Sequence, residues 1–98
     1  MTEIERLYEE IEKSDVVIIN HCKNHKAMAV CDEEGFCSIG IDEKKMESAA
    51  EHKAILLHER AHCKTGTFYN QMTPYERRGR LERRADRYVA ENDITKFM

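Results

Sequence analysis

The feature that most constrains this chain is the heptapeptide Leu-Leu-His-Glu-Arg-Ala-His at residues 56–62. It contains the pattern H-E-x-x-H within an apolar segment of helical periodicity. Residues four apart lie on the same face of a helix, so His58 and His62 can reach one metal ion. Two imidazoles at this spacing suit Zn²⁺, which binds nitrogen at about 2.0–2.1 Å. The motif therefore predicts a helix that carries a zinc site.

Glu59 follows the first histidine of the motif, so its carboxylate should point beside the metal position rather than at it. There it can accept a proton from a water molecule on the metal, which is the role of a general base. The spacing alone is not decisive, because a chain with this content of His and Glu shows the pattern by chance about 3 per cent of the time. The context must come from the rest of the chain.

Length and composition limit the class of protein. The chain has 98 residues, which predicts a single domain over 1–98 with a modest core. Charged residues make up 36 per cent, and no apolar run approaches the roughly 20 residues that a membrane helix needs. The N-terminus is acidic and lacks the basic start and the apolar stretch of a signal peptide. We therefore expect a soluble, cytoplasmic protein.

The cysteines form no C-x-x-C pair. With no secretory signal, we predict reduced thiols, with disulfides as the alternative. The four are Cys22, Cys31, Cys37 and Cys63. A second alternative is a structural zinc site built from His21, Cys22, His25, Cys31 and Cys37, although these spacings match no common zinc finger.

Capping and hydrophobic patterns predict the N-terminal elements. A capping box at Thr2 to Glu5, followed by apolar residues at helical spacing, predicts a helix to about residue 13. β-Branched or alternating segments at residues 16–19, 27–31 and 36–41 predict three strands, the last two paired as a hairpin.

Two further capping boxes predict the C-terminal helices. Ser48 to Glu51 begins the helix of the H-E-x-x-H motif, although Asp42 could begin it earlier, and it ends near Lys64. Thr73 to Glu76 begins the last helix, with Pro74 at its first helical position. The expected buried stripes are Ala50, Ala54, Leu57 and Ala61, then Leu81, Ala85, Tyr88 and Val89. The order predicts an α+β domain with its helices on one side of a small antiparallel sheet.

The last helix offers a third ligand, because a catalytic zinc uses three protein ligands and one open position. Glu82 and Asp86 lie one turn apart on one face. Glu82 suits the third ligand, while Asp86 could accept the ring N–H of a ligand histidine. In the alternative interpretation both carboxylates are solvated partners of neighbouring arginines at helical spacing. Those arginines are Arg78, Arg83 and Arg87.

Residues 54–90 resemble the ImmA/IrrE metallopeptidases, zincin-like proteins common on bacterial phages and integrative elements. The matching stretches are residues 57–63, 65–69 and 82–88, of which the last is similar to that family's E-x-x-A-[ND]-x-[FYW] signature. The resemblance implies that Glu82 is the third zinc ligand of a minimal, gluzincin-like domain. Two residues depart from the family pattern: Ala61 stands where Gly is usual, and Arg60 stands where an apolar residue is usual.

The resemblance also implies a function. Relatives act as site-specific proteases or anti-repressors on a helix-turn-helix repressor encoded beside them, which implies a zinc metallopeptidase with a protein substrate. The alternative is a non-catalytic protein that holds a repressor and has a structural zinc. Tyr69, in the family-like Gly-x-Phe-Tyr run, could donate a hydrogen bond to an oxyanion. Tyr75 could donate in the same way, although aromatic packing is the favoured role for either tyrosine.

The charge pattern limits the partners. The formal net charge is −3, which argues against nucleic acid as the main ligand. The local exception is residues 77–87, which hold six arginines against Glu82 and Asp86. We interpret this stretch as a solvated face. A docking surface for an acidic partner or a DNA-bound repressor is the alternative.

Overall fold

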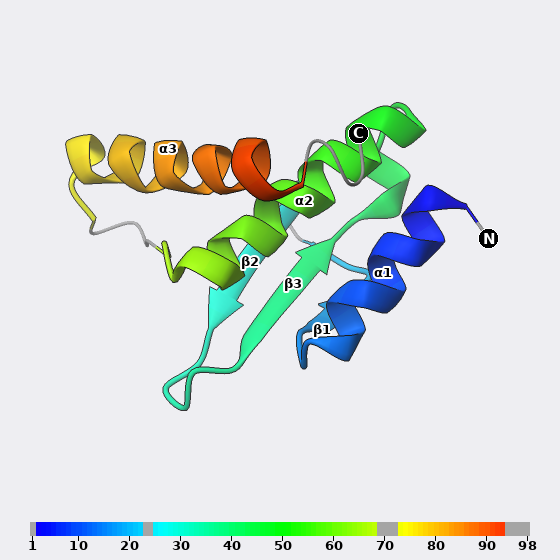
Figure 1. The fold of residues 1–98 in the computed structure, drawn as a ribbon, viewed down its shortest axis with the longest axis horizontal. Coiled ribbons are helices and arrows are strands. Elements are labelled where there is room, and N and C mark those ends of the chain that lie inside the picture. The colour runs from blue at the N-terminus through cyan, green and yellow to red at the C-terminus, as the bar shows by residue number, and fades with distance from the viewer. Residues whose placement is uncertain (1, 23–24, 69–72, 94–98) are drawn as a thin grey trace.

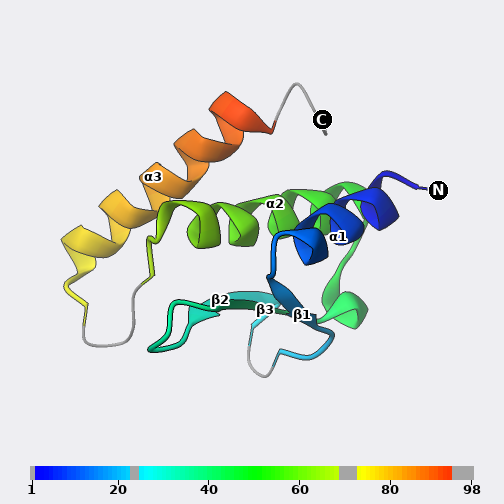
Figure 2. The same cartoon turned by 60° about the horizontal axis from the view of Figure 1, so that its bottom comes forward.

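Two helices cover one face of a small sheet, and a third helix crosses above them. The computed structural model describes residues 2–22, 25–68 and 73–93. The elements are α1 (Glu3–Lys13), β1 (Val17–Ile19), β2 (Ala27–Cys31), β3 (Cys37–Ile41), the 3-10 helix η1 (Glu43–Lys45), α2 (Ala49–Thr65) and α3 (Tyr75–Asn92). Helices α1 and α2 lie over the sheet, and α3 lies against the side of α2 that faces away from it (Figures 1 and 2). The predicted α+β class is confirmed.

The sheet is mixed, so the prediction of an antiparallel sheet is wrong for β1. The strand order is β1-β3-β2; β2 pairs antiparallel with β3, whereas β1 pairs parallel with it. The tight turn between β2 and β3 makes their pairing antiparallel. The connection from β1 to β2 leaves a gap of one strand between them. Strand β3 occupies this gap and runs in the same direction as β1. Gly40 permits this connection, because a Cβ there would lie 3.0 Å from the carbonyl oxygen of His21.

Side-chain caps fix the beginnings of α1 and α2 as predicted. The hydroxyl of Thr2 accepts a hydrogen bond from the N–H of Glu5, and Ser48 caps α2 in the same way. Helix α2 ends at Gly66, whose φ of 67° lies in the left-handed region that suits glycine. The predicted start of α3 is wrong by one residue: Pro74 has an extended ψ of 142° and is the N-cap, without a side-chain cap.

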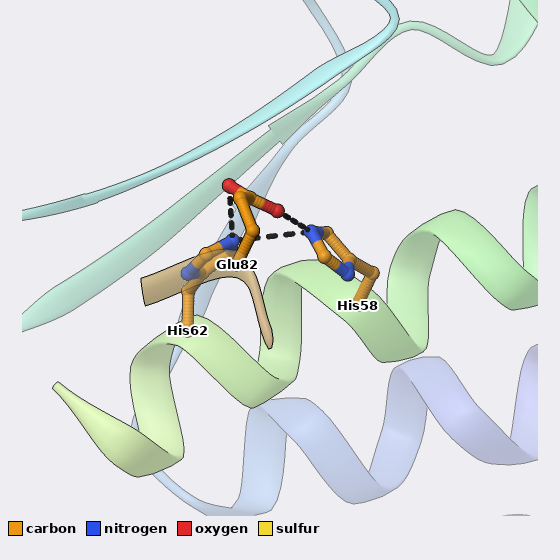
Figure 3. A group of neighbouring side chains, drawn as sticks. All are labelled: His58, His62 and Glu82. Carbon is orange, nitrogen blue, oxygen red and sulfur yellow. Dashed lines mark hydrogen bonds and ion pairs between the residues drawn. The ribbon is translucent and has the colours of Figure 1, made fainter. Parts of the chain in front are cut away.

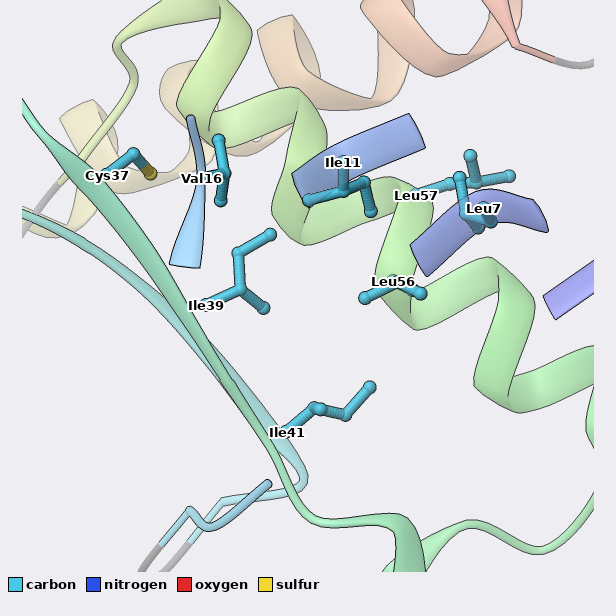
Figure 4. Packing of buried hydrophobic residues seen from close by; sticks show 8 residues of the cluster. All are labelled: Leu7, Ile11, Val16, Cys37, Ile39, Ile41, Leu56 and Leu57. Carbon is cyan, nitrogen blue, oxygen red and sulfur yellow. The ribbon is translucent and has the colours of Figure 1, made fainter. Parts of the chain in front are cut away.

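The core lies between the sheet and the two helices above it (Figure 4). Alternate residues of β3 point toward the helices, and the leucines of α2 meet them. The cluster consists of Leu7, Ile11, Val16, Cys37, Ile39, Ile41, Leu56 and Leu57. The predicted α2 stripe is correct for Leu57 and Ala61 but wrong for Ala50 and Ala54, which are exposed. Within the described ranges, no helix has the length and apolar character needed to cross a bilayer.

The prediction of reduced thiols is wrong for two of the four cysteines. Cys37 at the start of β3 and Cys63 in the last turn of α2 form a disulfide, with their Cα atoms 5.9 Å apart. Cys22 and Cys31 are free, the first buried and the second exposed. The pairing follows from the packing of β3 against α2, which brings together residues 26 positions apart.

A buried arginine links the three helices. One guanidinium nitrogen of Arg60 lies 3.2 Å from the Asp93 carboxylate at the C-cap of α3, and another lies 3.3 Å from Glu10 on α1. Arg60 and Asp93 are both buried. Because removal of one partner leaves the other charge buried, the pair is expected to be costly to break.

Loss of the disulfide should lower the free energy of unfolding. For a loop of 26 residues the chain-entropy relation gives a loss of about 3.5 kcal/mol. Urea denaturation of Cys63→Ala should therefore show a lower midpoint than the wild type, and reductant should lower the wild-type midpoint too. Cys31→Ser is the matched control and should behave as the wild type. If the urea midpoint of the wild type is the same with and without reductant, the prediction of reduced thiols would stand.

Asp93→Ala should destabilise the fold by about 3–5 kcal/mol, because it leaves the buried Arg60 charge without this partner. Glu91→Ala removes an exposed carboxylate from the same end of α3 and should change stability by less than about 0.5 kcal/mol. The double variant Arg60→Met/Asp93→Ala should lose less than the two single variants added together. Additive losses in thermal or urea unfolding would show that the two side chains are not coupled.

Candidate metal centre

Helices α2 and α3 bring two histidines and a glutamate to one point (Figure 3). His58 and His62 come from successive turns of α2, and Glu82 projects from the facing side of α3. The two Nε2 atoms lie 3.1 Å apart, and the Glu82 carboxylate oxygens lie 2.7 Å from Nε2 of His58 and 3.3 Å from that of His62. The fully buried Ala85 on α3 has a small side chain that permits close approach of the helices.

The other ring nitrogen of His62 is held by Thr67, just beyond the end of α2. Nδ1 of His62 lies 2.7 Å from the Thr67 carbonyl oxygen, so it donates its hydrogen there. The Thr67 hydroxyl lies 3.0 Å from the same nitrogen, and Thr67 is 1% exposed. This bond places a hydrogen on Nδ1, so in the neutral imidazole the Nε2 lone pair is directed toward Glu82.

Asp86 holds the ring of His58 in a corresponding way. Nδ1 of His58 lies 3.0 Å from the Asp86 carboxylate. This is the ring nitrogen that does not face Glu82, as the spacing of Glu82 and Asp86 predicts. The effect of Asp86 on metal binding stays a prediction.

The donor set fits a zinc ion. When both imidazoles are neutral, with their Nδ1 hydrogens donated to Thr67 and Asp86, two Nε2 lone pairs and a carboxylate converge on one point, where a bound cation or a proton on a ring nitrogen would offset their repulsion. Tetrahedral ligands about 2.0–2.1 Å from zinc lie about 3.3–3.4 Å apart. The Nε2–Nε2 distance of 3.1 Å and the distance of 3.3 Å from His62 to Oε1 of Glu82 are close to that value, whereas the distance of 2.7 Å from His58 to Oε2 is that of a hydrogen bond. Among the described residues, these three form the only group of His, Cys, Asp or Glu that meets the geometry of a metal site.

Glu59 lies beside the donor set rather than within it. Burial raises the pKa of its carboxyl group, while the neighbouring histidines His62 and His58 and a hydrogen bond from the backbone of Ala29 act in the opposite direction. Its carboxylate lines the same cavity as His62 and Glu82. The structure thus places Glu59 beside His62 and Glu82 in one cavity, and its role as a general base stays a prediction.

The cavity beside the donor set has a volume of about 390 Å³ and is bounded on one side by strand β2. Its lining residues are His25, Ala27, Met28, Ala29, Val30, Glu59, His62, Thr67, Phe68, Arg78 and Glu82. Sequence reasoning missed Thr67, Arg78 and the backbone of Ala29, because no local pattern marks residues that join a site through tertiary packing.

Strand β2 is an edge strand, so half of its backbone groups are directed away from β3. The backbone N–H of Asp42 donates to the carbonyl of Lys26, and the N–H of Asp32 donates to the carbonyl of Phe36. Because bonded and non-bonded residue pairs alternate along an antiparallel ladder, every second residue of β2 between Lys26 and Asp32 bonds to β3. The N–H and C=O groups of Ala27, Ala29 and Cys31 therefore point to the free edge. Ala29 already donates to Glu59 there.

The other predicted site residues do not belong to the described donor set, although His25 of the alternative second zinc site lines the cavity beside it. Tyr69 lies outside the described residues. Tyr75 is 88% exposed, so the aromatic packing expected of it is absent. In the alternative second zinc site, Cys37 is in a disulfide, and the described residues form no second group of suitable ligands.

Comparisons with family models, with curated proteins and with solved structures find no match for this chain. The resemblance to the ImmA/IrrE metallopeptidases therefore stays a prediction from the motif residues.

Asp86→Ala should weaken zinc binding less than Glu82→Ala does, because Asp86 orients His58 rather than facing the metal position. Partners of this kind typically contribute about 10- to 100-fold in metal affinity. Zinc titration against a competing chelator ranks the two variants. Asp93, near the chain end, is unsuitable as a neutral reference because it is buried; Glu91→Ala serves instead. If Asp86→Ala and Glu91→Ala bind zinc with equal affinity, the alternative interpretation of Asp86 as a solvated partner of the arginines would be favoured.

Proposed function

We propose that this chain is a zinc-dependent metallopeptidase of the ImmA/IrrE type. The observation that carries the proposal is the convergence of two Nε2 lone pairs and a carboxylate, with Glu59 beside them in an open cavity. The residues that would hold Zn²⁺ are His58, His62 and Glu82. When bound, the ion would polarise a substrate carbonyl and lower the pKa of a water molecule to about 7.

The free edge of β2 provides a way to orient a peptide. An extended substrate can pair with the outward N–H and C=O groups of Ala27 and with the C=O group of Ala29, which adds a strand to the sheet, while the N–H of Ala29 stays bonded to Glu59. Side chains of the substrate would then alternate between the cavity and solvent. The peptide would thereby pass beside Glu59 and the histidines.

Glu59 is the general base in this proposal. Its carboxylate accepts a proton from the attacking water and then donates that proton to the leaving amine, so the water gains nucleophilicity and the amine leaves neutral. Its position on the cavity wall, between β2 and the donor set, suits both transfers. His62 is fixed by Thr67 and His58 by Asp86, so their orientation needs no rearrangement.

The substrate class follows from the resemblance. We propose site-specific cleavage of a helix-turn-helix repressor in the cytoplasm, which would give the protein an anti-repressor role. The alternative, a non-catalytic protein that sequesters a repressor, would be favoured by a fourth protein ligand. Among the described residues the group contains three ligands and adjoins a cavity, which supports the enzyme.

Glu59→Gln should retain zinc and lose peptide cleavage, because the amide preserves shape but cannot accept the proton. The wild type should carry about one zinc per chain after purification without chelator. Elemental analysis measures the metal, and mass spectrometry of a helix-turn-helix repressor incubated with the protein measures cleavage. His58→Ala should lose both properties.

Glu76→Gln, an exposed change on α3, is the matched control and should retain both metal and cleavage. Absence of any transition metal, with no uptake of added zinc, would contradict the metal site itself. Cleavage by Glu59→Gln at the wild-type rate would instead contradict only the role of Glu59. Binding of the repressor without cleavage by the zinc-loaded wild type would favour the sequestering alternative.

A further inference from the structure

Charge is segregated along this chain. Residues 1–51 hold 13 acidic residues against six basic ones, while residues 52–98 hold six acidic residues against ten basic ones. The two halves contribute different outer helices to the fold, α1 and α3 (Figure 1). The molecule therefore has one acidic and one basic helical surface.

The basic surface is a stripe of arginines on α3. Arg77, Arg80 and Arg84 follow one another at intervals of three and four residues, so they share one helix face. All three are exposed, and none forms an ion pair with another described residue. Arg87 continues the stripe and is 4.0 Å from Glu91.

The acidic surface is a stripe of glutamates on α1. Glu5, Glu9 and Glu12 follow one another at intervals of four and three residues and are exposed. Within the chain, Glu9 pairs with the exposed Lys13 at 3.3 Å and Glu5 accepts a hydrogen bond from the hydroxyl of Thr2, so a partner arginine would compete with these weak surface contacts. A cavity of about 380 Å³ opens beside them, with the ring of Tyr8 in its wall. Carboxylates next to an aromatic ring form a suitable surface for a guanidinium group.

The two stripes match when the helices are antiparallel. The glutamates of α1 are spaced by four and then three residues, and the arginines of α3 have the same spacing when they are taken from the C-terminal end of the stripe. Both stripes span about 10.5 Å. We propose that the arginine stripe of one copy of this chain binds the glutamate stripe of a second copy. The pairs are Glu5–Arg84, Glu9–Arg80 and Glu12–Arg77.

The pairing must join two copies rather than fold one copy on itself. In both views α1 and α3 lie on different sides of α2 (Figures 1 and 2). Because the two surfaces differ, the contact is head-to-tail and each copy retains one surface of each kind for further association. Surface ion pairs are individually weak and are screened by salt, so the two copies should associate only at low ionic strength.

Sedimentation equilibrium tests the proposal on the full chain. In about 20 mM NaCl the average mass of the wild type should exceed the monomer mass of 11.5 kDa. In about 500 mM NaCl the average mass should equal the monomer mass, because the added salt shortens the Debye length and screens the ion pairs. Glu9→Arg and Arg80→Glu should each be monomeric at low salt. The double variant Glu9→Arg/Arg80→Glu restores opposite charges and the wild-type net charge, so it should associate again.

Two exposed changes control for net charge. Glu33→Arg in the β2–β3 turn and Lys64→Glu at the end of α2 alter the charge by the same amounts and should retain association. The proposal is overturned if the wild type is monomeric at both salt concentrations. It is also overturned if Glu9→Arg or Arg80→Glu associates at low salt, or if the double variant does not associate. A duplex DNA oligonucleotide bound by a monomeric wild type, and not by Arg80→Glu, would overturn it in favour of a polyanion.

Discussion

The ion pairs of Arg60 fix how the helices lie relative to one another. This guanidinium, in the second half of α2, contacts Glu10 on α1 and Asp93 at the end of α3. The candidate metal centre depends on Glu82 of α3 facing two turns of α2, so the direction in which α3 crosses α2 decides whether Glu82 meets His58 and His62. Ala85 sets how closely the helices approach, and Asp93 anchors the end of α3. A buried arginine is costly unless it is paired, so this contact also excludes arrangements that leave it unpaired.

The orientation of the two histidines depends on hydrogen bonds from their outer ring nitrogens. Each imidazole has two nitrogens, and its hydrogen-bond partner decides which one carries the hydrogen. Thr67 receives the hydrogen of His62 and Asp86 that of His58. Both Nε2 atoms then face Glu82, an arrangement that a positive charge, from a bound cation or from a ring proton, would stabilise. The carboxylates therefore have different tasks: Glu82 faces the shared point, and Asp86, one turn further along α3, faces the outer side of one ring.

The parts of the structure that depend on local chemistry could be predicted from the sequence. The caps at Thr2 and Ser48, the end of α2 at Gly66 and the position of β2 follow from residues close together in the chain. The meeting of His58 with His62 follows from helix geometry, and that of both with Glu82 from the ligand requirement of zinc. Parallel pairing of β1, the disulfide and the burial of Asp93 could not be predicted, because each depends on which distant segments pack together. Local spacing does not contain that information.

The two departures from the ImmA/IrrE pattern lie in the packing of α2 rather than at the donor atoms. Ala61 is fully buried, and Arg60 is 8% exposed. An apolar residue at position 60 would need apolar neighbours, whereas this chain has carboxylates at Glu10 and Asp93. The three positions are therefore coupled, since an arginine there is tolerated only where both helices supply acidic partners. The departure of Arg60 is thus explained by the helix interface that it stabilises, and it provides no argument against the metal centre.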